Sequence, residues 1–172
     1  MTVTKHKLFF AWQFEEEEQW LEEMAQQGLA LDGVGFCTYR FRKSAPEEYR
    51  TRLELLAHSP GHPESQDYIR FVEDTGAELV GSWFRWVYFR KKRDDGDFQL
   101  YSDLPARLRQ LDRILSLLAV IGGINLLCAL ADLLQGLLPG LLNLAVAGLA
   151  FWGGGRLWRR RGQLRRDQEL YE

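Results

Sequence analysis

The hydrophobic pattern divides the chain into a mixed front and an almost uniformly apolar back. From Ile114 to Gly155, forty-two residues include one charge, Asp132, and fourteen leucines. A single bilayer crossing takes about 20 apolar helical residues. The stretch therefore predicts two crossings, Ile114–Ala131 and Leu133–Gly155, joined by a tight turn, with Pro139-Gly140 near the middle of the stretch. A buried helix pair in a soluble core would need polar outer faces, which this pattern lacks.

The front alternates between helix-like and strand-like patterns. Apolar side chains recur at helical spacing after Glu15 and after Glu64, and Gly28 and Gly76 are natural helix stops. Aromatic and alternating stretches lie between the helices. The pattern predicts, in order, a strand (Lys5–Trp12), a helix (Glu15–Gln27), two strands (Leu29–Lys43 and Glu48–Leu56), a helix (Glu64–Thr75) and a long final strand (Ala77–Lys92).

This order, β-α-β-β-α-β, is the split βαβ pattern of ferredoxin-like folds. We therefore predict an α+β fold class, with a ferredoxin-like cytoplasmic domain in residues 1–104. Residues 105–172 would form a two-helix transmembrane hairpin with a basic cytoplasmic tail. Two helices would cover one face of a four-stranded antiparallel sheet, and the other face would lack a cover of its own.

The final strand carries aromatic side chains on both of its expected faces. Trp83, Val87 and Phe89 would point one way, and Phe84, Trp86 and Tyr88 the other. A half-exposed strand alternates with polar residues, so this strand is expected to be covered on both sides. The cover could be a ligand, a dimer partner, a second protein, the membrane surface or the linker that follows. The candidate ligand- or partner-binding residues are Trp83, Phe84, Trp86 and Tyr88.

Charge separates the two parts further. Residues 1–104 carry 13 Lys or Arg and 19 Asp or Glu, whereas residues 105–172 carry 9 and 5. Arginines flank the apolar stretch on both sides, and the connecting turn has none. Because positive flanks stay in the cytoplasm, we expect a multi-pass protein of the cell membrane with both termini cytoplasmic. Four arginines are candidate contacts to the anionic membrane surface: Arg156, Arg159, Arg160 and Arg161.

The apolar stretch offers few groups for transport chemistry. Asp132 is expected to reach water near the turn, and Asn125 to hydrogen-bond to another helix. Small residues, among them Gly122 and Ala147, would permit close helix packing. Two spans with so few polar side chains do not form a transporter alone.

The front shows no convergent catalytic set. His58 and His62 lie near Glu64, but two histidines in a turn are more often surface residues than part of a zinc site with three ligands. Cys37 is expected in the core, and the run from Glu15 is interpreted as a solvated helix start. No phosphate-loop motif is present, and an acidic front disfavours nucleic acid. We therefore expect no enzyme activity, no cofactor, no metal and no nucleic-acid partner.

Several segments of the front together resemble a known family. They are Phe9–Glu15, Trp20-Leu21, Gly35–Phe41, Tyr49–Leu55, Thr75–Glu78 and Trp86–Lys92. The combination is similar to the bacterial domain-of-unknown-function family numbered twenty-eight twelve, from residue 5 to about residue 104. The resemblance implies a membrane-anchored protein that is often encoded beside PadR-like transcriptional regulators. It carries over no catalytic residue.

Three functions fit these expectations. The first is a membrane-tethered sensory or regulatory module that contacts the lipid bilayer and binds a small ligand or a protein partner through its cytoplasmic sheet. The second is a homodimerising structural domain in which two sheets pack face to face. The third is an accessory subunit of a membrane transporter. An aromatic strand on an acidic domain favours the first.

Overall fold

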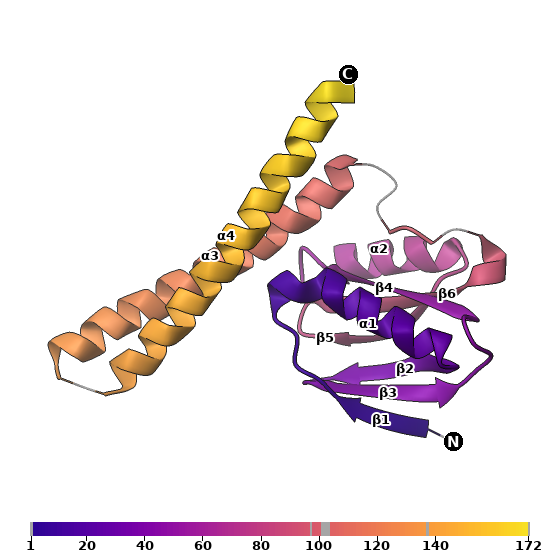
Figure 1. Ribbon diagram of the computed structural model, residues 1–172, viewed down its shortest axis with the longest axis horizontal. Coiled ribbons are helices and arrows are strands. Elements are labelled where there is room, and N and C mark those ends of the chain that lie inside the picture. The colour runs from indigo at the N-terminus through magenta and orange to yellow at the C-terminus, as the bar shows by residue number, and fades with distance from the viewer. Residues whose placement is uncertain (1, 97, 101–103, 137, 172) are drawn as a thin grey trace. The chain divides into compact units, whose positions relative to one another are not determined.

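The computed structural model describes residues 2–96, 98–100, 104–136 and 138–171, with side chains to residue 166. The chain forms two compact units, residues 1–102 and residues 103–172 (Figure 1). In the described residues, the first unit holds six strands and two α-helices, and the second holds two long helices.

The first unit is built from two three-stranded antiparallel sheets. Its helices are α1 (Phe14–Gln26) and α2 (Pro63–Asp74), with short 3-10 helices at Ala11–Gln13 and Arg93–Asp95. Its strands are β1 (Thr2–His6), β2 (Leu29–Gly35), β3 (Thr38–Lys43), β4 (Tyr49–Leu55), β5 (Glu78–Trp83) and β6 (Trp86–Lys92). The strand orders are β1-β3-β2 and β4-β6-β5. Each sheet with its helix is the same β-α-β-β unit, so the first unit is a tandem repeat.

The repeat is also visible in residues at equivalent positions. A constant offset along the chain places Gly28 on Gly76, and each follows its helix with a positive φ, 75° and 87°. Glycine suits this left-handed helix end because it has no Cβ. The same offset places Phe41 on Phe89, both 0% exposed, and the bulge of β2 on the bulge of β5. The two halves therefore share local backbone features as well as topology.

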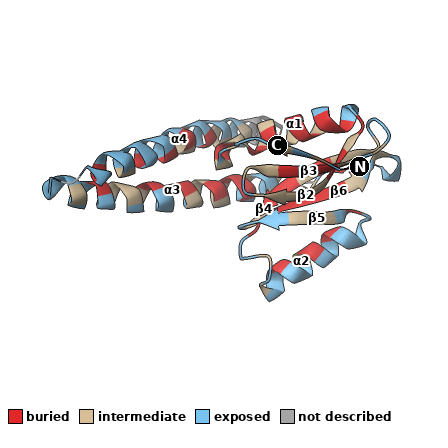
Figure 2. Ribbon diagram, turned by 90° about the horizontal axis from the view of Figure 1, so that it is seen from below, coloured by how far each residue is buried: buried red, intermediate tan, exposed pale blue. Residues whose placement is uncertain are grey.

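The strand β6 is buried on both faces because a helix covers each of them. Val87 and Phe89 pack in one core cluster with Ile69 of α2. On the opposite face, the hydroxyl of Tyr88 donates to Glu17 of α1. Figure 2 shows α1 and α2 on opposite sides of the strands. This double cover explains the apolar residues on both faces and replaces the predicted arrangement, in which both helices shared one face.

The sheet of the first half packs against α1 through aromatic rings. Trp20 meets Tyr39 and Phe41 of β3 edge-on, with ring centroids 4.9 and 5.7 Å apart. Leu21 and Met24, on the same helical face, are also buried. Edge-to-face pairs add about 0.5–1.5 kcal/mol each beyond the area that they bury. The aromatic content of β3 thereby fixes α1 over this sheet.

The two sheets meet where β2 runs beside β5, without a backbone ladder between these described strands. A Cβ added at Gly81 would lie 3.2 Å from Cγ2 of Val34, so the strands approach closely there. Arg90 ties the halves together, because its Nη1 donates to the carbonyl of Leu31 at 2.6 Å. Its Nε and Nη2 donate to Glu78 at 2.8 and 2.9 Å. The guanidinium is buried, so its three hydrogen bonds replace those lost to water.

Two predicted strands are in fact hairpins. Leu29–Lys43 is β2 and β3 joined at Phe36-Cys37, and Ala77–Lys92 contains β5 and β6 joined at Phe84-Arg85. The α+β class is confirmed, but the ferredoxin-like order is not observed. Neither turn contains the Gly, Pro, Asn or Asp that usually marks a hairpin, so the sequence pattern runs through both without a signal. The first strand also ends earlier than predicted, at His6.

The second unit consists of α3 (Leu104–Leu134) and α4 (Pro139–Tyr171), packed side by side. At one end of the pair, Asn143 donates to Asp132 at 3.0 Å. At the other end, Arg161 donates to both carboxylate oxygens of Asp112, at 2.6 and 3.2 Å. Between them, a Cβ added at Gly122 would lie 3.0 Å from the ring of Phe151. The absence of a side chain at Gly122 therefore lets the helices come close together.

Of the described helices, α3 alone is long and apolar enough to cross a membrane. Only 22% of its most apolar stretch is buried. The helix α4 falls short because Asn143, the glycines at 153–155 and the arginines from Arg156 dilute its apolar half. Large apolar side chains are exposed on both helices, including Leu127 and Leu142, each 69% exposed. Figure 2 shows exposed positions along both helices. The predicted pair of spans is thus supported for α3 alone.

Candidate functional site

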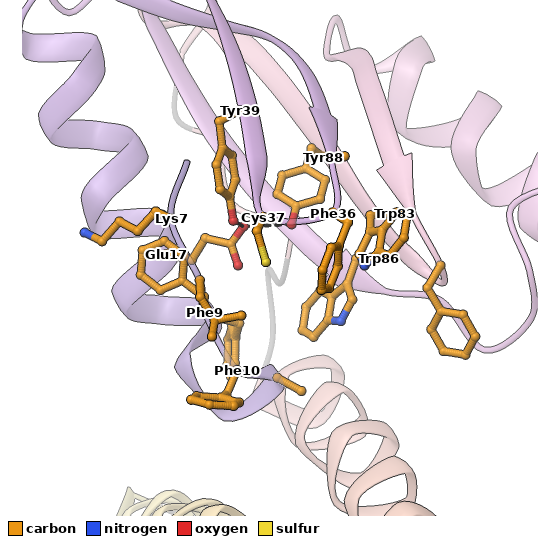
Figure 3. Close-up of a pocket in the computed structure, with 15 residues that line it drawn as sticks. Lys7, Phe9, Phe10, Glu17, Phe36, Cys37, Tyr39, Trp83, Trp86 and Tyr88 are labelled. Carbon is orange, nitrogen blue, oxygen red and sulfur yellow. Dashed lines mark hydrogen bonds between the residues drawn. The ribbon is translucent and has the colours of Figure 1, made fainter. Parts of the chain in front are cut away.

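A pocket of about 330 Å³ lies in the first unit, where both hairpin turns meet the segment before α1 (Figure 3). Phe36 and Phe84, which line it, occupy equivalent positions in the two halves of the repeat. The repeat thus brings two hairpin tips to one site. The aromatic lining residues are Phe9, Phe10, Phe14, Phe36, Tyr39, Trp83, Phe84, Trp86 and Tyr88.

A buried carboxylate, Glu17 of α1, is the acidic group among the lining residues. The hydroxyls of Tyr39 and Tyr88 both donate to its Oε1, each at 2.7 Å. These phenols come from β3 and β6, one from each sheet. Glu17 is 7% exposed, so the two hydrogen bonds hold a side chain of which little reaches water.

Burial sets the protonation of this cluster. It raises the pKa of Glu17 above its ordinary value of 4.5, while the hydrogen bonds from Tyr88 and Tyr39 act in the opposite direction. Burial also raises the pKa of Tyr88 and of Tyr39, and the nearby charge of Glu17 raises both further. Both phenols therefore remain protonated donors across the physiological range.

Both hairpin turns beside the pocket hold a non-glycine residue in the left-handed region. Cys37 has a φ of 50° and Phe84 a φ of 56°. This conformation costs a non-glycine residue about 1–2 kcal/mol. Strained residues of this kind concentrate at binding and catalytic sites, where the surrounding fold enforces them. Their presence at both tips marks the pocket as a candidate functional site.

Comparison with known proteins identifies the family. The family described as protein of unknown function (DUF2812) matches residues 13–122. The chain belongs to this family. The resemblance inferred from the sequence is confirmed, and the match runs from the 3-10 helix before α1 into α3. No curated protein and no solved structure matches the chain significantly.

The four binding residues predicted from the sequence all line the pocket of this DUF2812 protein. Trp83 and Trp86 are register partners across the β5–β6 hairpin, and Phe84 lies in its turn. Tyr88 lies deeper and holds the carboxylate. The sequence pattern placed Trp83 and Trp86 on opposite faces of one strand. The turn between them instead brings the two indoles to the same face.

Sequence reasoning missed Glu17, the polar centre of the site. Four consecutive glutamates at the start of a helix were interpreted as a solvated face. A signal was present, because Glu17 lies three and four residues before Trp20 and Leu21 and therefore on the same helical face. Both Trp20 and Leu21 are buried, so an acid on that face is expected to be buried as well.

The arginines predicted to lie at the membrane surface are Arg156, Arg159, Arg160 and Arg161, and all are in α4. Arg161 is held by Asp112 of α3 through the two hydrogen bonds described above. The guanidinium of Arg156 lies 5.5 Å from the ring centroid of Trp152. Arg159 and Arg160 are exposed. Arg161 is thus part of the helix pair, whereas the other three are on its surface or beside an aromatic ring.

A second cluster in this DUF2812 domain consists of His58, His62 and Glu64, whose possible ligand atoms all lie within 4.8 Å of one another. Nδ1 of His62 accepts from the backbone N–H of Glu64 at 3.3 Å, which caps the start of α2. Nε2 of His58 lies 3.4 Å from the Glu64 carboxylate. Helix capping accounts for the contact between His62 and Glu64 without a metal ion.

Proposed function

We propose that the chain is a membrane-tethered sensory module whose first unit binds a small ligand. The observation that carries the proposal is the aromatic pocket of about 330 Å³ around the carboxylate of Glu17. Small-molecule sites typically have volumes of about 300–1,000 Å³, apolar walls and a few fixed polar groups. The pocket has this size and this composition.

Recognition is a better account of the site than catalysis. Both phenols donate to one carboxylate oxygen, which fixes the geometry of Glu17. An active site would bring a nucleophile, a general base and an electrophilic group into mutual reach. Tyr39 and Tyr88 are instead arranged to hold one carboxylate in place. We therefore place the chain among regulatory binding modules and not among enzymes.

The second unit would hold this module at the membrane. Exposed leucines such as Leu127 and Leu142 form apolar surface that lipid would cover. The helix α3 can cross alone, and α4 would enter with it because the two helices pack along their length. The arginine-rich ends of both helices lie at the same end of the pair, as the contact of Arg161 with Asp112 shows. The positive-inside rule then favours cytoplasmic termini.

Cysteine labelling in cells tests the tether and its orientation. A Cys128→Ser variant leaves Cys37 of the first unit as the one thiol. A membrane-impermeant maleimide should label Cys37 only after the inner membrane is permeabilised. Labelling in intact cells would contradict the orientation. Recovery of the full chain in the soluble fraction, without detergent, would remove the tether.

Ligand-dependent stabilisation tests the binding function. The full chain in nanodiscs is screened with a panel of small organic cations, anions and neutral molecules, and its melting temperature is recorded. We expect at least one class to stabilise the wild type and the Phe71→Ala control, but not Trp86→Ala. Phe71 lies on α2 and is 65% exposed, so its removal leaves the pocket intact. A panel in which no stabilisation depends on Trp86 would overturn the proposal.

Self-association is a second candidate function, favoured by the exposed hairpin tips. Phe36 and Phe84 are 68% and 63% exposed, and large exposed aromatic side chains often mark interfaces. A homodimer would bury these rings and is tested by the mass of the full chain in mild detergent. A monomeric mass that the Phe36→Ser variant leaves unchanged would exclude it.

A further inference from the structure

We propose that the pocket binds a small organic cation, an amine or quaternary ammonium on an aromatic or branched apolar body. The cationic centre would pair with Glu17, and the apolar body would lie among the aromatic rings of the wall. This inference rests on the proposed function, because it names the chemical class of ligand that the pocket takes.

The carboxyl group of Glu17 faces the pocket without a positive partner among the described residues. Since both phenols donate to Oε1, the second oxygen, Oε2, remains available to a ligand. Within the described part of the chain, Glu17 forms no ion pair with Lys or Arg. A carboxylate buried without a positive partner is unfavourable. A bound cation would supply that partner, and the free energy gained would appear as affinity.

The aromatic wall of the pocket is also suited to a cation. Aromatic faces attract cations because their π electrons are negative, and recognition of ammonium groups commonly uses several rings at once. The domain already holds one cation in this way, since Nζ of Lys7 lies 4.8 Å from the ring centroid of Phe9 and 4.9 Å from that of Trp20. Figure 3 shows Lys7 directed away from Glu17. Lys7 therefore leaves the charge of Glu17 to a ligand.

Other ligand classes use the site less completely. An anion would be repelled by Glu17 and by the faces of the rings. A neutral apolar molecule would fill the cavity but leave Oε2 of Glu17 without a partner. A cation with an apolar body pairs the carboxylate and also covers the indoles of Trp83 and Trp86. The distinction between cationic and neutral ligands can be tested with molecules of the same shape.

The test uses three probes and the full chain in nanodiscs of phosphatidylcholine, a lipid with no net charge. The probes are phenyltrimethylammonium, its uncharged carbon isostere tert-butylbenzene, and benzenesulfonate. Binding is followed by quenching of tryptophan fluorescence and by calorimetry, with empty nanodiscs as the blank. The variants are Glu17→Gln, which removes the charge and keeps an acceptor, and Glu23→Gln, which removes an exposed charge from the same helix.

We expect the wild type to bind phenyltrimethylammonium at least about tenfold more tightly than tert-butylbenzene, because loss of one partner of a buried charge pair typically costs that much or more. Glu17→Gln should abolish this preference, and Glu23→Gln should keep it. Trp86→Ala should weaken both probes.

Equal binding of the cation and its isostere to the wild type would overturn the inference, even if the Glu17→Gln variant does not fold. Preference for benzenesulfonate would overturn it as well. In either case the proposed function stands, because the pocket would still bind a ligand in a Trp86-dependent way. The proposed function fails only if no compound of any class shows that dependence.

Discussion

The two β-α-β-β halves of the first unit share a scaffold but differ in what they bury. The offset that places Gly28 on Gly76 also places Glu17 of α1 on Ser65 of α2, and both are buried, with 7% and 4% exposure. In the first half this position is a carboxylate held by two phenols. In the second half, α2 covers an apolar cluster. The second half folds with a serine at this position, so the scaffold does not require a carboxylate there. Its buried acid is instead Glu54 of β4, which accepts from the hydroxyl of Tyr68.

The largest expected effect tests whether the halves contribute equally to the core. Phe41 and Phe89 occupy equivalent positions and are both 0% exposed. Replacing either one by Ala should lower the free energy of unfolding by about 3–5 kcal/mol, because a large buried ring leaves a cavity. Urea unfolding of each full-length variant provides the measurement. A loss below about 1 kcal/mol for one of them would show that the cores are not equivalent.

The next effect separates two arginines at equivalent positions. Arg90 is buried and joins the two sheets through Leu31 and Glu78, whereas the side chain of Arg42 is 41% exposed. Arg90→Ala should cost about 2–3 kcal/mol of stability, because it removes a buried guanidinium and leaves the buried carbonyl of Leu31 unpaired. Arg42→Ala should cost less than about 1 kcal/mol. Similar losses for the two variants in the same urea assay would remove the special role of Arg90.

A smaller effect concerns the glycines that end the two helices. Gly28 and Gly76 have positive φ, so Ala at either position should cost about 1–2 kcal/mol. Gly28→Ala should be the worse of the two. Its Cβ would lie 2.9 Å from the carbonyl oxygen of Ser44, whereas the nearest atom to a Cβ at Gly76 is Cε of Lys91 at 3.7 Å. A lower melting temperature for Gly76→Ala than for Gly28→Ala would contradict the predicted effect of the close contact at Gly28.

The smallest expected effect is the pH dependence that Glu17 contributes from the first half. Burial raises the pKa of Glu17 above 4.5, so the folded protein holds that proton more tightly than the unfolded chain. The stabilisation is complete below pH 4.5 and is lost as the pH rises through the raised pKa. Tyr39 and Tyr88, which face this carboxyl, stay protonated throughout, and Cys37 lies near Tyr39. Melting temperatures of the ligand-free protein should show this trend.

Two variants complete the pH experiment. Glu17→Gln removes the titrating group and should flatten the decrease in melting temperature. Ser65→Ala alters the equivalent position of the second half, which is not acidic, and should leave the decrease in melting temperature unchanged. A decrease that persists in Glu17→Gln would assign the pH dependence to another group.

The sequence predicted both short helices and the α+β class, because helical periodicity and glycine stops are local signals. It did not predict the hairpins, because Phe36-Cys37 and Phe84-Arg85 adopt their turns under tertiary constraint and not by turn propensity. The internal repeat was missed for the same reason, since each half seemed to contain one long strand. The two missed turns lie at equivalent positions of the repeat.

The candidate site was predicted in part. The sequence predicted four of the pocket residues because aromatic residues were unusually dense on one predicted strand: Trp83, Phe84, Trp86 and Tyr88. Glu17 was not predicted, because its burial depends on Tyr39 and Tyr88, which are far away in sequence and reach it only through the fold. In the second unit, two spans were predicted from composition alone, and only α3 is long and apolar enough among the described helices. The second predicted span contains Asn143, which donates to Asp132.

The line where β2 meets β5 has a mechanical consequence. Backbone hydrogen bonds resist shear within each sheet, but no backbone ladder joins β2 to β5. Side chains link the sheets instead, among them Arg90 through Leu31 and the two phenols that share Glu17. The tips carrying Phe36 and Phe84 stand on opposite sides of this line. Sliding of one sheet relative to the other along this line would widen or narrow the gap between those tips. A ligand that contacts both tips would restrain that movement. Arg90 would then set how stiff that joint is.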